Sequence, residues 1–240
     1  MYFNAYTNKG NFRETNEDDF LLDTSSFSYD IAAVADGMGG HQAGEVASKM
    51  AVNYLQGFQF NLQSDIMEEI GKVIRDINQK LIKMADNNLE YRGMGTTLSL
   101  IIIDKNILYL GHVGDSRIYL YRNNKLSQLT TDDTLVQKMI ADNKIEPEEA
   151  FNHPRSNILT QGLGIDTLSE VETAQLTLQK KDLVLLCTDG LSDMFRKQEI
   201  EDLLSSLSFR KQTNYAQKLG RRALKRGAKD NITVITGLVN

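Results

Sequence analysis

This sequence has few of the residues that mark secreted, membrane-spanning or low-complexity proteins. Its 240 residues include one cysteine and two prolines. A single cysteine excludes an internal disulfide and fits a reducing compartment, so we expect a cytoplasmic protein. No run of about 18 apolar residues occurs, so we expect no membrane span. The N-terminus has no basic segment followed by an apolar one, so we expect no secretory signal.

The chain also lacks repeats, low-complexity tracts and linkers rich in proline, glycine or serine. We therefore expect one domain over residues 1–240, a length that buries a core without disulfides or structural metals. The net charge is −5, and nucleic-acid binders usually carry a basic face, so we expect no nucleic-acid partner. Residues 210–229 are basic. We interpret them as a solvated helix face, with a docking patch for an acidic partner as the alternative.

Apolar patterns predict strands in runs and helices in pairs. The expected strands are residues 31–35, 96–103, 107–113, 117–122, 125–129, 183–187 and 232–238. The expected long helices begin near Ala43 and after a Ser64 cap, and near residues 197–207 and 213–226. This grouping predicts an α+β fold in which helix pairs cover antiparallel sheets. Residues 132–168 are polar and irregular, and a segment of that length between strands is often functional.

Acidic residues accompany several of the predicted strands. Asp36-Gly37 and Asp189-Gly190 end apolar strands, Asp230-Asn231 precedes one, and Glu17-Asp18 lies near the N-terminus. Side chains at strand ends can converge at one edge of a sheet. Carboxylates that meet there repel one another and raise each other's pKa unless a cation compensates.

Oxygen ligands of this kind suit Mg²⁺ or Mn²⁺ rather than zinc. A glycine after the aspartate lets the backbone carbonyl approach an ion. Two ions about 3.5–4 Å apart can share a water, lower its pKa and orient it for in-line attack. Each cluster alone has another explanation, because Asp-Gly is a common turn pair and Glu17-Asp18 could be surface charge. Only the combination is informative.

Six motifs occur in an order and spacing that resemble the PPM/PP2C protein phosphatases, from residue 2 to residue 239. In chain order they are RETNED (13–18), VADGMGGH (34–41), GMGTT (93–97), GHVGDSR (111–117), CTDGL (187–191) and DNIT (230–233). The DGMGGH form is similar to the compact bacterial branch, which counters membrane Ser/Thr kinases. The resemblance implies a four-layer αββα sandwich, with two central antiparallel sheets and a helix pair on each outer side.

The resemblance also implies roles for the acidic residues. Asp36 is expected to bridge two metals. One site would be completed by Glu17 and the Gly37 carbonyl, and the other by Asp189 and Asp230. Asp18 is expected to hydrogen-bond a metal-bound water.

A third, weaker metal site of the bacterial branch would involve Asp115 together with Asp189. The alternative for Asp115 is that it only fixes a turn. Residues 132–168 match the mobile flap beside the active site. One departure occurs at the flap entrance, where the branch usually has Asp-His-Ser and this chain has Asp132-Asp133-Thr134.

Three further residues complete the predicted chemistry. Arg13 is expected to bind phosphate, because a guanidinium contacts two phosphate oxygens and keeps its charge. His41 could protonate the leaving alkoxide, or it could instead cap the helix that begins near Ala43. Cys187 lies among leucines without a phosphate-binding loop, so we interpret it as a core residue.

We therefore predict a protein serine/threonine phosphatase that hydrolyses phosphoserine and phosphothreonine by direct attack of a water held between two Mn²⁺ or Mg²⁺ ions, with a possible third ion. The expected partners are phosphorylated proteins and a cognate Ser/Thr kinase, and we expect a monomer. Two rival hypotheses are a two-metal hydrolase of other phosphoesters and a silent family member with a regulatory role. A silent member would be expected to have lost metal carboxylates, and all are present here.

Overall fold

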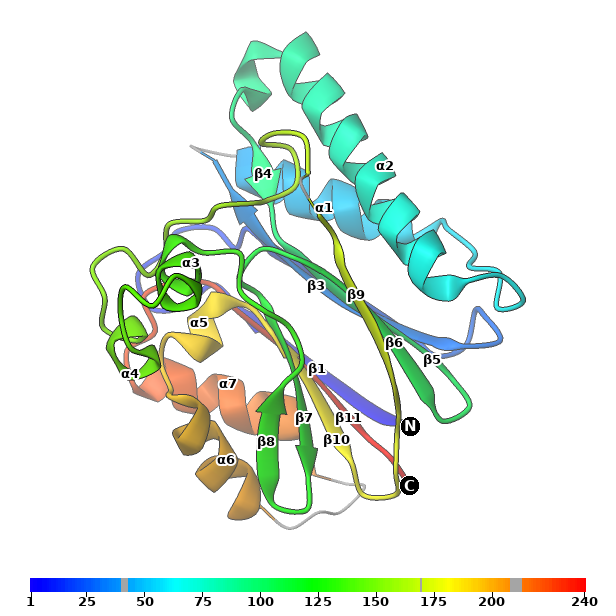
Figure 1. The fold of residues 1–240 in the computed structure, drawn as a ribbon, viewed down its shortest axis with the longest axis vertical. Helices are drawn as coiled ribbons and strands as arrows, with labels where there is room; N and C mark the ends of the chain where they lie inside the picture. Colours follow the sequence, from blue (N-terminus) through cyan, green and yellow to red (C-terminus); the bar gives the residue numbers. More distant parts are fainter. Residues whose placement is uncertain (40–42, 169, 208–212) are drawn as a thin grey trace.

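The computed structural model describes residues 1–39, 43–168, 170–207 and 213–240. Two antiparallel sheets lie at the centre (Figure 1). One, here called the β10 sheet, has the strand order β1-β11-β10-β7-β8. The other, the β3 sheet, has the order β2-β3-β5-β6-β9, with β4 paired to β3. Among the described residues, no helix is long and apolar enough to cross a membrane.

The strands of the two sheets have the following bounds. They are β1 Tyr2–Asn8, β2 Asp18–Asp23, β3 Asp30–Met38, β4 Gly95–Thr96, β5 Leu98–Asp104, β6 Ile107–Val113, β7 Arg117–Arg122, β8 Lys125–Gln128, β9 Glu172–Thr177, β10 Leu183–Cys187 and β11 Ile232–Leu238. The helices are α1 Ala43–Gln56, α2 Ile66–Asn87, the 3₁₀ helix η1 Leu89–Tyr91, α3 Leu135–Ala141, α4 Pro147–Ala150, α5 Asp189–Ser192, α6 Lys197–Ser205 and α7 Tyr215–Lys225.

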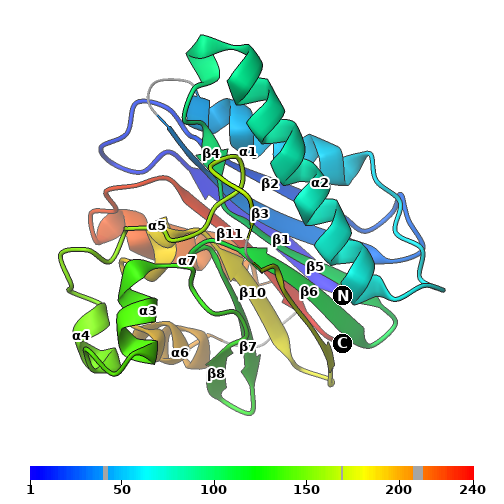
Figure 2. The ribbon, with the colours of Figure 1, turned by 45° about the horizontal axis from the view of Figure 1, so that its top comes forward.

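Helix pairs cover the outer faces of both sheets, which gives the four layers predicted from the sequence. Helices α1 and α2 pack on the β3 sheet, and α6 and α7 pack on the β10 sheet (Figure 2). Strands β1 and β11 pair along their full length, so the two chain ends lie side by side. The fold class predicted from the grouping of strands and helices is confirmed.

Burial on both faces explains why the central strands are uninterrupted apolar runs. In β3, Ile31, Ala33 and Ala35 join the core under α1 and α2. Between them, Ala32 and Val34 face the core between the two sheets. Strand β10 divides in the same way, with Leu185 under the helices and Leu186 between the sheets. A strand covered on both sides shows no alternation of polar and apolar residues.

Helix α2 packs through the apolar face predicted from its spacing, which includes Ile70, Ile74 and Ile77. Its N-cap is Asp65 and not Ser64, because the Asp65 side chain accepts from the N–H groups of Met67 and Glu68. The neighbouring Ser64 hydroxyl donates instead to a loop carbonyl.

Two strand predictions need correction. The strand expected at residues 96–103 is interrupted and forms two strands, β4 and β5. Each of them pairs with β3. Strands β1, β2 and β9 are absent from the expected ranges, because half-exposed edge strands have weak apolar patterns. Residues 132–168, here called the flap, contain the short helices α3 and α4. The neck of this segment closes through a bridge between Thr134 and Leu159.

Candidate active site

The predicted acidic residues meet in one pocket between the two sheets. Asp18 and Asp36 lie directly opposite each other in the β2–β3 pair, while Asp189 begins α5 just after β10. The pocket has a volume of about 380 Å³. It is lined by Arg13, Glu17, Asp36, Gly37, Met38, Gly39, Thr97, Asp115, Asn157, Leu159, Asp189 and Asp230. Glu17, Asp36, Asp189 and Asp230 therefore line one pocket, although they come from both sheets and not from the edge of a single sheet as expected.

Burial and mutual repulsion dominate the electrostatics of this pocket. Burial raises the pKa of Asp36 and of Asp189 well above the usual range, and neighbouring carboxylates raise each further. Burial also raises the pKa of Asp18 to about 7, although hydrogen bonds from the hydroxyls of Thr188 and Thr233 oppose that rise. Such a group of buried acids is stable as anions only with compensating positive charge.

Two properties of the described residues fit divalent cations in this pocket, and a third indicates how an ion would be held. The donors are all oxygens, which Mg²⁺ and Mn²⁺ prefer. Two buried carboxylate oxygens, Asp18 Oδ1 and Asp189 Oδ1, have no hydrogen-bond partner in the described structure, which is unusual for buried polar atoms. Within the described ranges, no three Asp, Glu, His or Cys side chains converge on one point. Any ion here would therefore complete its shell with waters and a backbone carbonyl, as Mg²⁺ commonly does.

Glycine is required at position 37 by the close approach of helix α1. A Cβ on Gly37 would lie 2.2 Å from the carbonyl oxygen of Gly44. The Gly37 N–H donates to the carbonyl of Glu17 at 3.2 Å, and the Ser48 hydroxyl donates to the same carbonyl at 2.6 Å. The start of α1 thereby fixes Glu17 and the Asp36-Gly37 peptide against each other.

Arg13 lies on the exposed rim of the pocket and contacts a carboxylate there. Its Nη2 donates to Asp230 Oδ2 at 2.6 Å, and this contact raises the pKa of Arg13. The side chain of Arg13 is 53% exposed, so its remaining N–H groups are accessible to a ligand in the pocket. The sequence predicted the position of Arg13 at the site but not this ion pair.

Asp115 lies in the turn between β6 and β7 and is half-buried. Burial raises its pKa to about 7, and the nearby Asp132 and Asp193 carboxylates contribute. It lines the acidic pocket and also a neighbouring groove of about 430 Å³. That groove lies between the flap and the segment that contains α5 and α6.

The remaining residues considered in the sequence analysis are His41, Cys187 and the basic residues of α7. His41 lies outside the described residues. Cys187 is fully buried, and burial raises the pKa of its thiol to about 12, which fits the predicted core role and not a nucleophile. On α7, Lys218, Arg221 and Lys225 are exposed, as predicted for a solvated basic face. They border a separate hollow of about 290 Å³ between α6 and α7 that includes none of the predicted acidic residues.

Two residues with positioning roles belong to the motifs named above, but no function was predicted for them. Thr97 accepts from the N–H of Asp36 at 3.0 Å and donates its own N–H to the Asp36 carbonyl. Asn231 accepts from the N–H of Glu17 and donates to the carbonyls of Lys9 and Thr15. Both fix the backbone of a predicted ligand, and only contacts across the fold reveal this.

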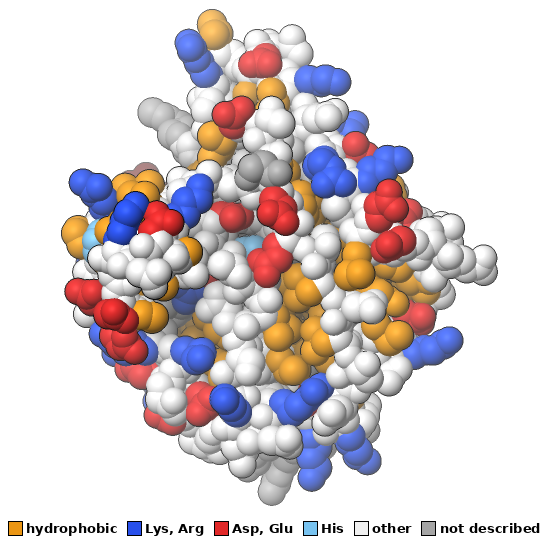
Figure 3. Space-filling view, in the orientation of Figure 1, with side chains coloured by type: hydrophobic (Ala, Val, Ile, Leu, Met, Phe, Trp, Pro, Cys, Tyr) orange, Lys and Arg blue, Asp and Glu red, His pale blue; other side chains and the backbone are white. Residues whose placement is uncertain are grey.

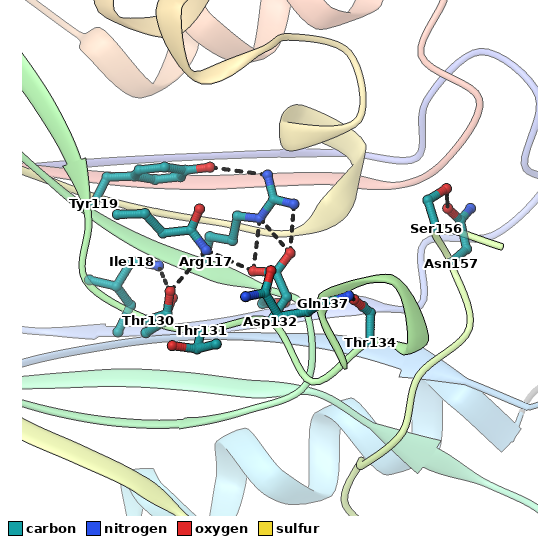
Figure 4. A network of polar contacts seen from close by, with 12 residues as sticks. Arg117, Ile118, Tyr119, Thr130, Thr131, Asp132, Thr134, Gln137, Ser156 and Asn157 are labelled. Atoms are coloured by element: carbon teal, nitrogen blue, oxygen red, sulfur yellow. Dashed lines mark hydrogen bonds and ion pairs between the residues drawn. The ribbon is translucent and has the colours of Figure 1, made fainter. Parts of the chain in front are cut away.

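A polar network beside the pocket joins the first residue of β7 to the flap. Arg117 donates through Nε and Nη2 to the carboxylate of Asp132, the shortest distance being 2.6 Å, and Nη1 donates to the Tyr119 hydroxyl (Figure 4). Gln128 also donates to Asp132.

On the face shown in Figure 3, a small group of acidic side chains lies near the middle, and other acidic and most basic side chains lie around the periphery.

Comparison with known proteins agrees with this fold. The protein phosphatase 2C family matches residues 12–226. The serine/threonine phosphatase stp of Listeria welshimeri is 38% identical, over 98% of this chain and 94% of the relative. The crystal structure of Stp1 from Staphylococcus aureus superposes with a TM-score of 0.91 at 32% identity, covering 99% of this chain and 94% of that one.

A further solved structure is the catalytic domain of the serine threonine protein phosphatase PstP in complex with two manganese ions. It superposes with a TM-score of 0.84 at 32% identity and covers 99% of this chain and 98% of that one. The similarity to the Listeria relative extends over 98% of this chain, and all residues that line the acidic pocket except Asp230 lie within residues 12–226. The chain therefore belongs to the protein phosphatase 2C family.

Proposed function

We propose that this chain hydrolyses phosphoserine and phosphothreonine in proteins, with divalent cations held in the acidic pocket. The observation that supports this most directly is the group of buried carboxylates around Asp36 and Asp189, whose charge no described basic residue fully offsets. Residues 1–240 would form one phosphatase domain, with residues 132–168 as its flap.

Two Mn²⁺ or Mg²⁺ ions would lie on either side of Asp36. Glu17 and the Gly37 carbonyl would hold one ion, and Asp189 and Asp230 the other. When bound, such ions lower the pKa of a water and neutralise charge that develops on the phosphate. Burial and the neighbouring carboxylates raise the pKa of Asp36 and of Asp189, and bound cations would offset this repulsion.

The remaining side chains would orient the reactants. Arg13 would bind phosphate oxygens through the guanidinium N–H groups that do not contact Asp230. Asp18 Oδ2 accepts from the Thr188 hydroxyl at 2.8 Å. Its partnerless Oδ1 would accept a hydrogen bond from one of the waters around the ions and so hold that water in place.

Asp115 is not needed to complete the central pair of ions. We propose that it binds a third, weaker ion together with Asp189 and assists protonation of the leaving group. Its half-buried position on the wall shared by the two hollows supports this role. Asp115→Ala should lower kcat on phosphopeptides while calorimetric titration still detects two tightly bound Mn²⁺ ions. Loss of a tight ion, or an unchanged kcat, would reject the third-ion role.

We also propose that the protein acts in the cytoplasm as a monomer and opposes a Ser/Thr kinase. The single cysteine, which is buried and free, fits a reducing compartment. The natural substrates would then be the proteins that this kinase phosphorylates.

Phosphate release from a phosphoserine peptide tests the proposed activity. Release should require added Mn²⁺ or Mg²⁺, should stop in excess EDTA, and should resume when the metal is restored. A phosphodiester of similar size should be hydrolysed at least about 100-fold more slowly, since the pocket offers Arg13 for a dianionic phosphate. Full activity after verified metal removal would refute the mechanism. Faster phosphodiester hydrolysis would favour the rival phosphoesterase, and no hydrolysis of either substrate would favour a silent regulatory protein.

A further inference from the structure

Asp133 is the residue at which the flap entrance departs from the pattern Asp-His-Ser. It lies between Asp132, which pairs with Arg117 (Figure 4), and Thr134, which caps α3 by accepting from the N–H of Gln137. Asp133 itself is half-buried. Its neighbours are therefore fixed on both sides, and its own contacts are directed into the molecule.

Asp133 contacts the turn before β7 with both its backbone and its side chain. Its N–H donates to the carbonyl of Gly114 at 2.7 Å. In return, its Oδ2 accepts from the N–H of Gly114 at 2.9 Å. Both polar groups of the Gly114 backbone are thus bonded to one residue.

The same residue closes the neck of the flap. The carbonyl of Asp133 accepts from the N–H of Thr160 at 2.7 Å, and its Oδ2 also accepts from Gln161 Nε2 at 3.3 Å. Asp133 therefore connects the start of the flap to residues 160 and 161, near its end, and to the turn that precedes β7. A carboxylate suits this junction, because one oxygen accepts two hydrogen bonds.

The turn held by Asp133 is the one that contains Asp115. Gly114 has a φ of 108°, and a Cβ there would lie 2.6 Å from the Thr97 side chain, so the turn has little freedom to adopt another shape. On the other side of Asp115, the Ser116 hydroxyl bonds the Thr97 hydroxyl at 2.7 Å. Asp115 thus lies between one residue bonded to Thr97 and another bonded to Asp133.

We propose that Asp133 is a positioning residue that sets the direction of the Asp115 side chain into the active-site pocket. Its carboxylate holds the Gly114 N–H, in the peptide before Gly114, and its backbone N–H holds the Gly114 carbonyl, in the peptide that leads to Asp115. The two bonds together fix the conformation of Gly114, which orients the Cα–Cβ bond of Asp115. Because Asp133 also closes the flap neck, a change in the placement of the flap alters the placement of Asp115. This inference rests on the proposed role of Asp115 in phosphopeptide hydrolysis.

The alternative is that Asp133 only stabilises the flap. Replacing it would then lower stability and raise KM, but the effect on kcat would not depend on Asp115. A double-mutant cycle separates the two roles, because residues that act through one another are not additive. Asp142→Ala is a matched control, since Asp142 is an exposed flap aspartate whose bonded side-chain partner is Lys144.

The experiment compares Asp133→Ala, Asp133→Asn, Asp115→Ala and the double variant Asp133→Ala/Asp115→Ala. With a phosphoserine peptide and Mn²⁺, Asp133→Ala should lower kcat about 5- to 20-fold and change KM less than about twofold, because a small displacement of a catalytic group is costly. Asp133→Asn should restore most of kcat, since its amide oxygen accepts the same bonds. In the Asp115→Ala background, adding Asp133→Ala should change kcat less than about twofold.

A second measurement does not depend on catalysis. In the metal-free protein, NMR hydrogen exchange at the Gly114 amide should accelerate about tenfold or more in Asp133→Ala. Asp133→Asn and Asp142→Ala should stay close to the wild type. If Asp133→Ala does not fold, Asp133→Ser replaces it, since a serine hydroxyl is too short to reach Gly114.

The possible outcomes distinguish this inference from the proposed function. An active wild type with an unchanged kcat in Asp133→Ala overturns the inference alone. So does an equal loss of kcat in the presence and absence of Asp115, or unaltered exchange at Gly114. A wild type that does not hydrolyse the phosphopeptide overturns the proposed function, and the inference falls with it.

Discussion

Buried and half-buried carboxylates occur in two regions of this molecule with opposite surroundings. Asp182 and Asp132 each accept two or more hydrogen bonds from a guanidinium, of Arg122 and Arg117 respectively. Asp36 and Asp189 instead face other acids, and burial raises their pKa well above the usual range. A carboxylate that is paired with an arginine of the chain, such as Asp182 or Asp132, joins parts of the fold. Carboxylates without such a partner, such as Asp36 and Asp189, are suited to bind a metal cation from solution.

The largest effect should come from removing a carboxylate in the uncompensated region. Asp36→Asn should lower kcat on a phosphopeptide about 1000-fold or more, because the charge between the two proposed metal positions is lost. Steady-state kinetics at saturating Mn²⁺ measures this. Asp182→Asn is the matched control, and it should keep kcat within about twofold. Near-normal activity of Asp36→Asn would remove the basis of the comparison.

The compensated region should show its effect in stability instead. Asp182→Asn should lower the free energy of unfolding by about 2–4 kcal/mol, because it leaves Arg122 without the charge of a buried partner. Urea denaturation followed by circular dichroism measures this loss. The exposed Asp142→Asn should change stability by less than about 0.5 kcal/mol. Equal losses in the two variants would show that burial of the pair is unimportant.

The pH dependence of stability should also separate the regions when metal is absent. Asp18 has a folded pKa of about 7 and a reference value of 3.8, so the native state binds its proton more tightly than the unfolded state does. Stability from this group is present below about pH 4 and is lost as pH rises to about 7.

In EDTA, the free energy of unfolding should therefore fall between pH 4 and pH 7, and the contribution of Asp18 should be on the order of 4 kcal/mol. Asp18→Asn should flatten this part of the profile, and Mn²⁺ should restore stability at pH 8. Chemical denaturation at a series of pH values gives the answer. An identical slope in wild type and Asp18→Asn would count against uncompensated burial.

Arg13 lies between the two regions, because it is a cation at the edge of the acidic pocket. Arg13→Ala should raise KM for a phosphopeptide about 3- to 10-fold, with a smaller change in kcat, if its contact with phosphate is mainly ground-state binding. Arg13→Lys should recover only part of the loss, since an ammonium cannot make the forked contact. An unchanged KM would show that Arg13 pairs with Asp230 but does not bind the phosphate.

The smallest effect is expected at Cys187, which belongs to neither region. Cys187→Ser should keep kcat within about twofold and lower stability by about 1–3 kcal/mol, because a hydroxyl enters an apolar core. Trapping a phosphocysteine at this position would refute direct attack by water.

The sequence by itself determined the layers and the chemical class of the site. Strands buried on both faces, such as β3 and β10, must be apolar throughout, so their positions were visible in the composition of short windows. Asp189 follows such a strand and Asp230 precedes one, whereas Asp36 lies near the end of β3 and Glu17 precedes the edge strand β2. Six motifs in the right order therefore predicted both the family and the residues of the pocket.

Only the tertiary structure decided which partner each polar side chain has. The pairs Arg13–Asp230, Arg117–Asp132 and Asp133–Gly114 join residues separated by 15 or more positions, and nothing in a local pattern specifies them. Strand β9 was missed for the same reason, because it is a half-exposed edge strand defined by pairing with β6. Apolar burial leaves a periodic record in the sequence, whereas a hydrogen bond between distant residues depends on a geometry that exists only after folding.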